Sequence, residues 1–279
     1  VKLSRETKAL LKQKPKGEKL LHLNRLLLED AYSKALKKHK CIALTEKLKE
    51  DYVVGIDIGL NNLAAITSNQ RDLKPILING RPLKSINRYF NKKRAKLMSY
   101  IGGKGTSRRL EKLTHKRNCI IENYLHNASK FIIKLLVKHR IGTLVIGKNK
   151  GWKQSINIGK KNNQNFVSIP HALFVQQLQY KGELAGINVI ITEESYTSKC
   201  SFLDNEEIKK HKKYLGKRIG RGLFESKNGT KINADINGSA NIIRKVIPNA
   251  FAHAFAKGIQ GIVVFPERIT PLKAKITHL

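Results

Sequence analysis

The stretch Val53-Val54-Gly55-Ile56-Asp57-Ile58-Gly59-Leu60-Asn61-Asn62-Leu63 places one carboxylate inside an apolar run that is rich in β-branched residues. Such runs favour β-strands, and the Gly-Leu-Asn-Asn segment that follows is typical of a turn. A lone ionised Asp in an apolar strand is costly, so such a residue is usually neutralised, paired or bound to a cation. The stretch therefore predicts a strand that carries a functional carboxylate.

A second carboxylate, Asp235, has a similar apolar setting in Ile232-Asn233-Ala234-Asp235-Ile236-Asn237-Gly238-Ser239-Ala240-Asn241-Ile242. The chain has 279 residues, of which 55 are Lys or Arg and 20 are Asp or Glu, and its formal charge is +35. This excess repels itself and favours a polyanionic partner, and nucleic acid fits better than a membrane because no amphipathic anchor is evident. Together these features indicate a metal-dependent site that acts on a polyanion. The plainer alternative is a basic, ribosome-associated protein.

The cysteines indicate a reducing compartment. Cys41, Cys119 and Cys200 are odd in number and widely spaced, which is not the pattern of a secreted disulfide framework. The sequence has no apolar run of about 18 residues and its first residues are too charged for a signal peptide. We therefore expect a cytoplasmic protein that does not cross a membrane. The sequence begins with Val1 rather than Met, so the question of whether a segment precedes it is left open.

The order of the expected elements predicts an α/β fold, a mixed sheet with helices on its faces. A hairpin and a third strand are followed by a long helix that begins after Ser107 and ends at Gly142. A short strand, a helix, a second buried strand and a last helix directly behind Asp235 complete the order. The expected strands span 51–58, 63–67, 75–80, 143–147 and 188–192, and the expected shorter helices span 170–186 and 238–247.

Cations are concentrated between residues 84 and 140, where they are interpreted either as a solvated face or as a track for a phosphate backbone; the overall charge favours the track. The loop after residue 147 adds an aromatic side chain beside cations, a pairing suited to single-stranded bases. The candidate nucleic-acid-binding residues are Lys92, Lys93, Arg94, Arg108, Arg109, Lys116, Arg117, Trp152 and Lys153.

Two divalent cations that hydrolyse a phosphodiester need acidic oxygen ligands, and three or four acids suffice because Mg²⁺ retains water. Asp57 and Asp235 supply two. Glu193 and Glu194 stand at the end of a predicted buried strand and supply the third, and strand alternation lets only one of them point at the site. Ordinary solvation of these two residues is the alternative.

The segments around Asp57 and Asp235, with Tyr196-Thr197-Ser198-Lys199, resemble the first and last motifs of the RuvC-type nuclease domain of TnpB (OrfB) proteins, transposon-encoded relatives of type V CRISPR effectors. The resemblance implies an RNase H-like fold over residues 51–247 and DNA cleavage that depends on Mg²⁺ or Mn²⁺ and is guided by RNA. It also implies that Asp57 and Asp235 are the first and last catalytic acids. On this basis residues 1–50 are a basic N-terminal appendage, 84–140 a helical insertion, 199–231 a degenerate zinc-ribbon region and 248–279 a weakly structured tail.

The chain departs from the family pattern in three places. The family carries its middle glutamate at the end of the strand that corresponds to residues 143–147, where this chain has Gly147. We expect Glu193, in preference to Glu194, to replace it. The family's paired CxxC motifs are absent, and because Cys200 and the distant His211 cannot form a tetrahedral site, no structural zinc is expected. The segment before residue 50 is short beside the family's recognition region.

Three function classes remain open. The first is a RuvC-like endonuclease, the second is a truncated or cleavage-deficient relative that binds nucleic acid, and the third is a sugar-kinase- or chaperone-like ATPase. The Asp-x-Gly of Asp57 to Gly59 resembles the first phosphate loop of such ATPases. The ATPase class requires a second glycine-rich phosphate loop, which does not stand out, and the charge of the chain also disfavours it.

Overall fold

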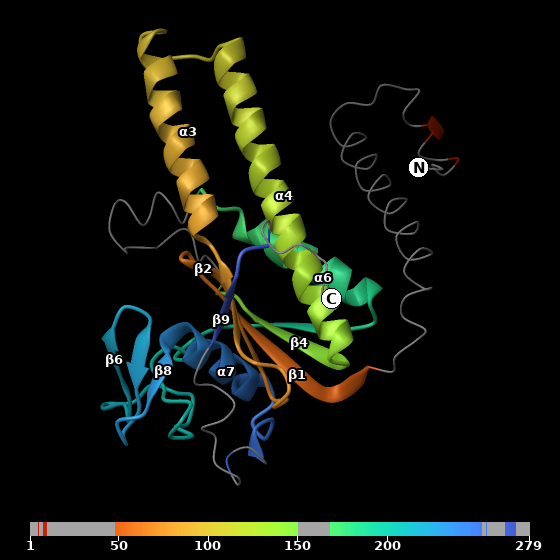
Figure 1. Cartoon of the computed structure of the whole chain (residues 1–279), viewed down its shortest axis with the longest axis vertical. Coiled ribbons are helices and arrows are strands. Elements are labelled where there is room, and N and C mark those ends of the chain that lie inside the picture. Colours follow the sequence, from red (N-terminus) through yellow and green to blue (C-terminus); the bar gives the residue numbers. More distant parts are fainter. Residues whose placement is uncertain are drawn as a thin grey trace.

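The strand that contains Asp57 lies inside a six-stranded mixed sheet with the order β5-β4-β1-β2-β3-β9 (Figure 1). The computed structural model describes residues 48–149, 168–252 and 266–271, together with Arg5, Lys8, Ala9 and Phe255. The predicted hairpin is confirmed, because β1 pairs antiparallel with β2 and β2 with β3, whereas β4, β5 and β9 run parallel to their neighbours. The strands are β1 (Lys49–Ile58), β2 (Asn62–Ser68), β3 (Ile76–Asn79), β4 (Ile141–Gly147), β5 (Asn188–Thr192) and β9 (Glu267–Ile269).

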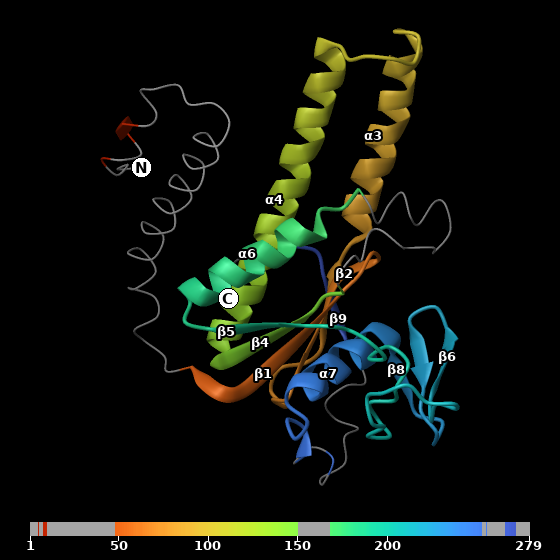
Figure 2. The ribbon, with the colours of Figure 1, turned by 180° about the vertical axis from the view of Figure 1, so that it is seen from behind.

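Helices cover both faces of this sheet, as Figures 1 and 2 show from opposite sides. Helices α4 and α6 lie on one face, and α7 lies on the other. The predicted α/β arrangement of a mixed sheet with flanking helices is therefore present. The helices are α3 (Arg81–Ser99), α4 (Arg108–Lys138), α6 (His171–Leu184) and α7 (Ala234–Val246).

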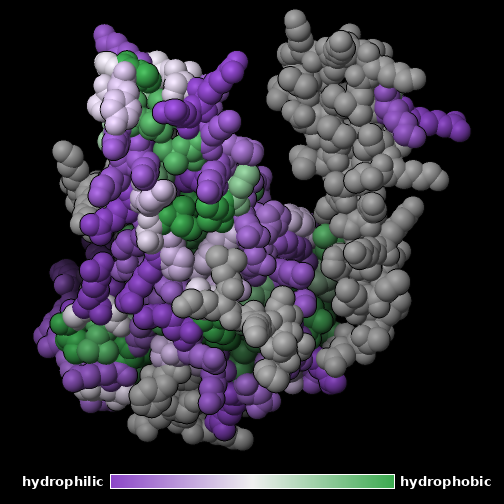
Figure 3. Space-filling view, turned by 45° about the horizontal axis from the view of Figure 1, so that its top comes forward, coloured by the Kyte–Doolittle hydropathy of each residue, from purple (hydrophilic) through white to green (hydrophobic). Residues whose placement is uncertain are grey.

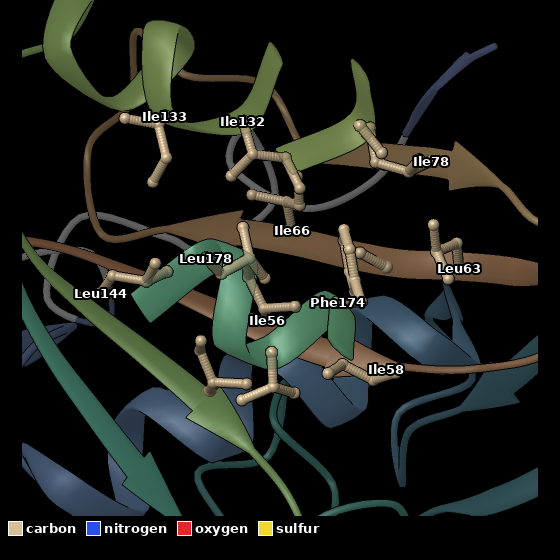
Figure 4. Packing of buried hydrophobic residues seen from close by; sticks show 14 of the residues in the cluster. Ile56, Ile58, Leu63, Ile66, Ile78, Ile132, Ile133, Leu144, Phe174 and Leu178 are labelled. Carbon is tan, nitrogen blue, oxygen red and sulfur yellow. The ribbon is translucent and has the colours of Figure 1, made fainter. Parts of the chain in front are cut away.

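The alternation of side chains along β1 divides the core into two layers. Val54, Ile56 and Ile58 point toward α4 and α6, where Figure 4 shows isoleucines of the sheet packed against side chains of both helices. Val53 packs into the second layer, with the buried side chains of α7. Because the period of a strand is two, Asp57 points to the same face as Val53, toward α7.

The helix pair α3 and α4 extends beyond the sheet (Figure 1). Helix α4 begins as predicted, with the Ser107 hydroxyl accepting a hydrogen bond from the Leu110 amide. Hydrophilic side chains lie along both flanks of the projecting pair in Figure 3. The apolar side chains of α4 are largely buried, but Ile120 is exposed.

The prediction that Gly142 ends α4 was wrong. The helix ends at Lys138, Arg140 takes a positive φ of 56°, and Gly142 lies within β4. A Cβ on Gly142 would stand 2.4 Å from the carbonyl oxygen of Lys49. This glycine is therefore explained by the close approach of β1 to β4 and not by helix termination.

Three further expectations were wrong. β5 is an edge strand whose side chains are exposed or half-buried, so it is not the buried strand predicted. Part of the predicted weakly structured tail forms β9, which pairs with β3. No strand was predicted between residues 192 and 238, but this segment contains a second antiparallel sheet of β6 (Lys217–Gly220), β7 (Leu223–Glu225) and β8 (Lys231–Asn233).

The described part of the chain contains no helix that is both long and apolar enough to span a membrane. The predicted N-terminal appendage lies almost entirely outside the described residues. The division of the chain into domains stays a prediction.

Candidate functional site

Asp57 lies at the contact between β1 and α7, and two glycines make this contact possible. A Cβ on Gly238 would stand 2.6 Å from Oδ2 of Asp57, so the carboxylate fills the space that a larger residue would need. A Cβ on Gly55 would stand 2.4 Å from the carbonyl oxygen of Ser239 in α7. The helix can approach the strand this closely only because both positions lack a side chain.

Asp235 belongs to the first turn of α7, because the helix begins at Ala234, four residues earlier than expected. The Asn233 side chain caps this helix by accepting hydrogen bonds from the amides of Asp235 and Ile236 at 3.0 and 3.2 Å. An acid in the first turn also lies in the favourable field of the helix N-terminus. Helix α7 therefore carries one acid of the site and packs against the strand that carries another.

Two polar groups hold the Asp235 carboxylate. Nδ2 of Asn62 donates a hydrogen bond to Oδ2 at 2.7 Å, and the guanidinium of Arg218, from β6, lies 3.9 Å from Oδ1. Neither residue was singled out from the sequence. Asn62 opens β2 directly after the turn that follows the Asp57 strand, so its position there was an available signal. Nothing in the sequence marks Arg218 among the many cations.

Glu194, not Glu193, accompanies the two aspartates. Oε1 of Glu194 lies 2.6 Å from where a Cβ on Gly147 would stand, so its carboxyl group lies above the end of β4. The Glu194 amide donates to Oδ1 of Asn149 at 2.8 Å, which ties the segment after β5 to the segment after β4. Glu193 is exposed and accepts a hydrogen bond from the Ser195 hydroxyl at 2.7 Å. The structure therefore favours Glu194 over Glu193 as the neighbour of Asp57, and the role of either residue as a ligand stays a prediction.

The electrostatic surroundings of Asp57 include the other two acids. Burial raises the pKa of Asp57 well above its ordinary value, the negative charges of Glu194 and Asp235 raise it further, and Arg218 opposes them. Burial raises the pKa of Glu194 to about 7, with Lys245 opposing the rise. Ionised carboxylates that repel one another in this way favour a cation between them.

The donor set suits a hard divalent cation, for which oxygen ligands are preferred. Oε1 of Glu194 is buried and has no hydrogen-bond partner among the described residues, so a ligand position is open. As the side chains of the described residues are placed, no three His, Cys, Asp or Glu stand close enough together to hold a metal ion. Binding a cation would therefore require the carboxylates to rotate toward one another.

The candidate nucleic-acid-binding residues that the structure describes all lie on helices α3 and α4. Lys92, Lys93 and Arg94 on α3, and Arg108, Arg109 and Lys116 on α4, are all exposed on the projecting helix pair. Trp152 and Lys153 lie outside the described residues.

Arg117 differs from the other candidates because its guanidinium is occupied within the protein. It donates to Oδ1 of the buried Asn87 at 2.9 and 2.7 Å and to the carbonyl oxygen of Ser168. Its guanidinium also lies 5.6 Å from the centre of the Phe90 ring. Arg117 therefore joins α3 to α4.

Acidic side chains and a buried thiol organise the segment that was interpreted as a degenerate zinc ribbon. The buried Glu206 carboxylate accepts hydrogen bonds from the amides of Ser201 and Leu215 at 2.7 and 2.9 Å. The thiol of Cys200 is buried and contacts the carbonyl oxygens of Glu207 and Lys209. The absence of a structural zinc stays a prediction.

Two family models match different parts of this chain. A model described as a probable transposase, of the OrfB type of IS605 elements, matches residues 28–153. A model described as the TNB domain of Cas12f1-like proteins matches residues 171–242. Together they cover more than half of the chain and include Asp57, Glu194 and Asp235.

The chain is also similar in sequence to curated proteins of the Cas12f and TnpB-like types. The chain is 27% identical over 212 residues to the CRISPR-associated endodeoxyribonuclease Cas12f2 of a Micrarchaeota archaeon, covering 70% of this chain and 37% of that protein. It is 27% identical over 217 residues to Cas12f1 of Sulfoacidibacillus thermotolerans, covering 74% and 47%. It is 24% identical over 243 residues to the TnpB-like protein ORF457 of Acidianus two-tailed virus, covering 81% and 48%. The chain thus spans less than half of the length of each of these relatives.

Solved structures share the fold. The Cas12f1 chain in a complex with single-guide RNA and target DNA has a TM-score of 0.54 at 18% identity, covering 71% of this chain and 50% of that chain. A CRISPR-Cas12f ternary complex gives 0.54 at 17% identity, covering 71% and 39%.

The raised pKa of Glu194 predicts a pH-dependent stability difference in the metal-free protein. A carboxyl group whose pKa is raised on folding stabilises the folded state below its unfolded pKa, near 4.5, and loses that contribution as the pH rises through about 7. Glu194→Gln should therefore leave stability almost unchanged at pH 5 and increase the free energy of unfolding by roughly 1–3 kcal/mol at pH 8. Urea unfolding at both pH values measures this, with the exposed Glu193→Gln as the control. Equal effects of the two substitutions at pH 8 would contradict the assigned environment of Glu194.

Proposed function

Because the chain belongs to the TnpB (OrfB) family, which is related to the type V CRISPR effectors, we propose that it is a RuvC-like DNA endonuclease of RNase H-like fold that depends on divalent metal ions and is directed by a guide RNA. The observation that supports this most strongly is the convergence of Asp57, Glu194 and Asp235 from β1, the segment after β5 and the start of α7. We place Glu194 in the role of the middle acid that the family carries where Gly147 stands.

Asp57, Glu194 and Asp235 would hold two Mg²⁺ or Mn²⁺ ions through oxygen ligands only. Such cations lower the pKa of a bound water and stabilise the charge on the attacking and leaving oxygens of a phosphodiester. The chain's own contribution is to present carboxylates from rigid elements, which keeps their positions defined. Arg218 and Lys245 reduce the negative charge of the site and so ease the approach of a polyanionic strand.

The projecting helix pair supports a nucleic-acid partner. Its cations, among them Lys92, Lys93 and Arg94, are exposed where the sequence predicted a track for a phosphate backbone, and phosphate contacts of this kind contribute affinity independent of sequence. DNA and RNA are the partners of the relatives whose complexes share the fold. We extend both partners to this chain as part of the proposal.

A cleavage-deficient nucleic-acid-binding protein is the second candidate. The observation that favours it is Gly147, because the family's acid is missing from β4. The space that Gly147 leaves is filled by the Glu194 carboxyl group, and for this reason we place the endonuclease first.

Cleavage assays separate the two candidates. The protein, with and without co-expressed RNA, is incubated with plasmid and single-stranded DNA in Mg²⁺ or Mn²⁺. Asp57→Ala and Glu194→Gln should each lower the cleavage rate by about 100-fold or more, because losing a ligand costs at least as much as losing the partner of a ligand. Glu193→Gln is the matched control for Glu194→Gln and should cleave at the wild-type rate. Cleavage that survives Asp57→Ala would exclude Asp57 as a ligand, and salt-sensitive binding without cleavage in either metal would establish the binding protein.

The phosphate track predicts a change in the salt dependence of binding. Replacing Lys92 and Lys93 by Ala should reduce the slope of log K against log[salt] by roughly 1.4–1.8, since each phosphate contact contributes about 0.7 for single strands and 0.9 for duplex DNA. Lys134 and Lys138, exposed near the other end of α4, provide a double-Ala control with the same change in charge. Fluorescence anisotropy at several salt concentrations measures both slopes. If the two double variants give the same slope, α3 is not part of the track.

A further inference from the structure

Asn62 connects the Asp57 hairpin to Asp235. Asn62 is 7% exposed and is the first residue of β2, immediately after the turn that follows the Asp57 strand. Nδ2 donates to Oδ2 of Asp235 at 2.7 Å, across a contact between residues far apart in the chain. Because Asn62 is nearly buried, this hydrogen bond is shielded from competing water.

The turn that leads into Asn62 is held in place by contacts with both neighbouring segments. The Gly59 amide donates to the Leu63 carbonyl at 3.3 Å, and the Gly80 amide donates to the Asn61 carbonyl at 2.8 Å. A Cβ on Gly80 would stand 2.4 Å from the Leu60 carbonyl oxygen, so the start of α3 packs closely against the turn. The backbone of Asn62 therefore has little freedom, and the orientation of its amide is passed on to the carboxylate that it contacts.

The two oxygens of Asp235 consequently have different surroundings. Oδ2 is engaged by Asn62, whereas Oδ1 lies 3.9 Å from Arg218, whose side chain is half-exposed. A half-exposed arginine is displaced more easily than a buried amide donor. Oδ1 is therefore the oxygen that remains available to a cation.

The other end of the Asn62 amide also points to a ligand. Its Oδ1 is buried and has no hydrogen-bond partner among the described residues. A buried amide oxygen without a donor is costly, and the waters that Mg²⁺ keeps when it binds to protein are donors of suitable size.

We propose that Asn62 is a positioning residue for the metal site: it holds Oδ2 of Asp235 so that Oδ1 faces the cation. The inference rests on the proposed function, because it assumes that Asp235 is a metal ligand. In this role Asn62 fixes the rotation of the Asp235 carboxylate, which neither Asp57 nor Asp235 can do.

Binding of Mn²⁺ without nucleic acid tests this role apart from activity. The free-Mn²⁺ signal in electron paramagnetic resonance gives the affinity of the full chain. Asn62→Ala should weaken binding by about 10- to 100-fold, the usual effect of losing a partner of a metal ligand. Asn61→Ala is the matched control, because Oδ1 of Asn61 accepts its hydrogen bond from Lys84 at 2.8 Å and not from a residue of the carboxylate site. This control should bind within about twofold of wild type.

Two further variants keep every outcome informative. Asn62→Leu retains most of the volume and lacks the donor, so it should reproduce the weak binding of Asn62→Ala if that variant does not fold. If wild type and Asp57→Ala bind Mn²⁺ equally, the metal site and the proposed function fail together. If Asp57→Ala loses binding while the folded Asn62 variants keep wild-type affinity, only the positioning role is overturned.

Discussion

The close contact between α7 and β1 is the constraint on which the site depends. Gly55 and Gly238 remove the two side chains that would otherwise separate helix and strand, and the Asp57 carboxylate lies in the space left at Gly238. With the helix this near, Asp235 in its first turn is brought toward Asp57, and the Asn62 turn is within hydrogen-bonding distance of Asp235. An alanine at Gly55 would have to move the backbone of α7 at Ser239, and an alanine at Gly238 would displace the Asp57 carboxylate.

This arrangement has an energetic cost in the metal-free protein. Burial and mutual repulsion raise the pKa of Asp57, and burial raises that of Glu194. Part of the charge is offset by Arg218 and Lys245, which is consistent with a site that must tolerate carboxylates before a cation arrives. Such local destabilisation is common where groups are arranged for function instead of stability.

Local patterns predicted much of the central sheet. The apolar run around Asp57, the turn after it and the Ser107 cap each act within a few residues, and all three were recovered. Sequence alone could not choose between Glu193 and Glu194, because the choice depends on the hydrogen bond between Glu194 and Asn149, which lie in the segments after two different strands. Gly142 was misread because a glycine required by a neighbouring strand looks the same in sequence as one that ends a helix.

The small sheet of β6 to β8 and the roles of Arg218 and Arg117 could not be predicted from the sequence. Strands β6 to β8 are three or four residues long, too short for a periodic signal, so the contact of Arg218 with Asp235 had no marker. Arg117 looked like its exposed neighbour Lys116, and only the tertiary structure shows that Asn87 and Ser168 occupy it. The β9 strand likewise gains its partner, β3, from a distant part of the chain.

The central claim is that Glu194 replaces the family's acid at Gly147 and joins Asp57 and Asp235 around a divalent cation. A crystal structure of the full chain with Mn²⁺, with anomalous scattering used to locate the ion, tests this directly. The account predicts an anomalous peak coordinated by carboxylate oxygens of Asp57, Glu194 and Asp235. A peak coordinated by Glu193, or Mn²⁺ bound elsewhere with these three carboxylates unoccupied, would contradict it.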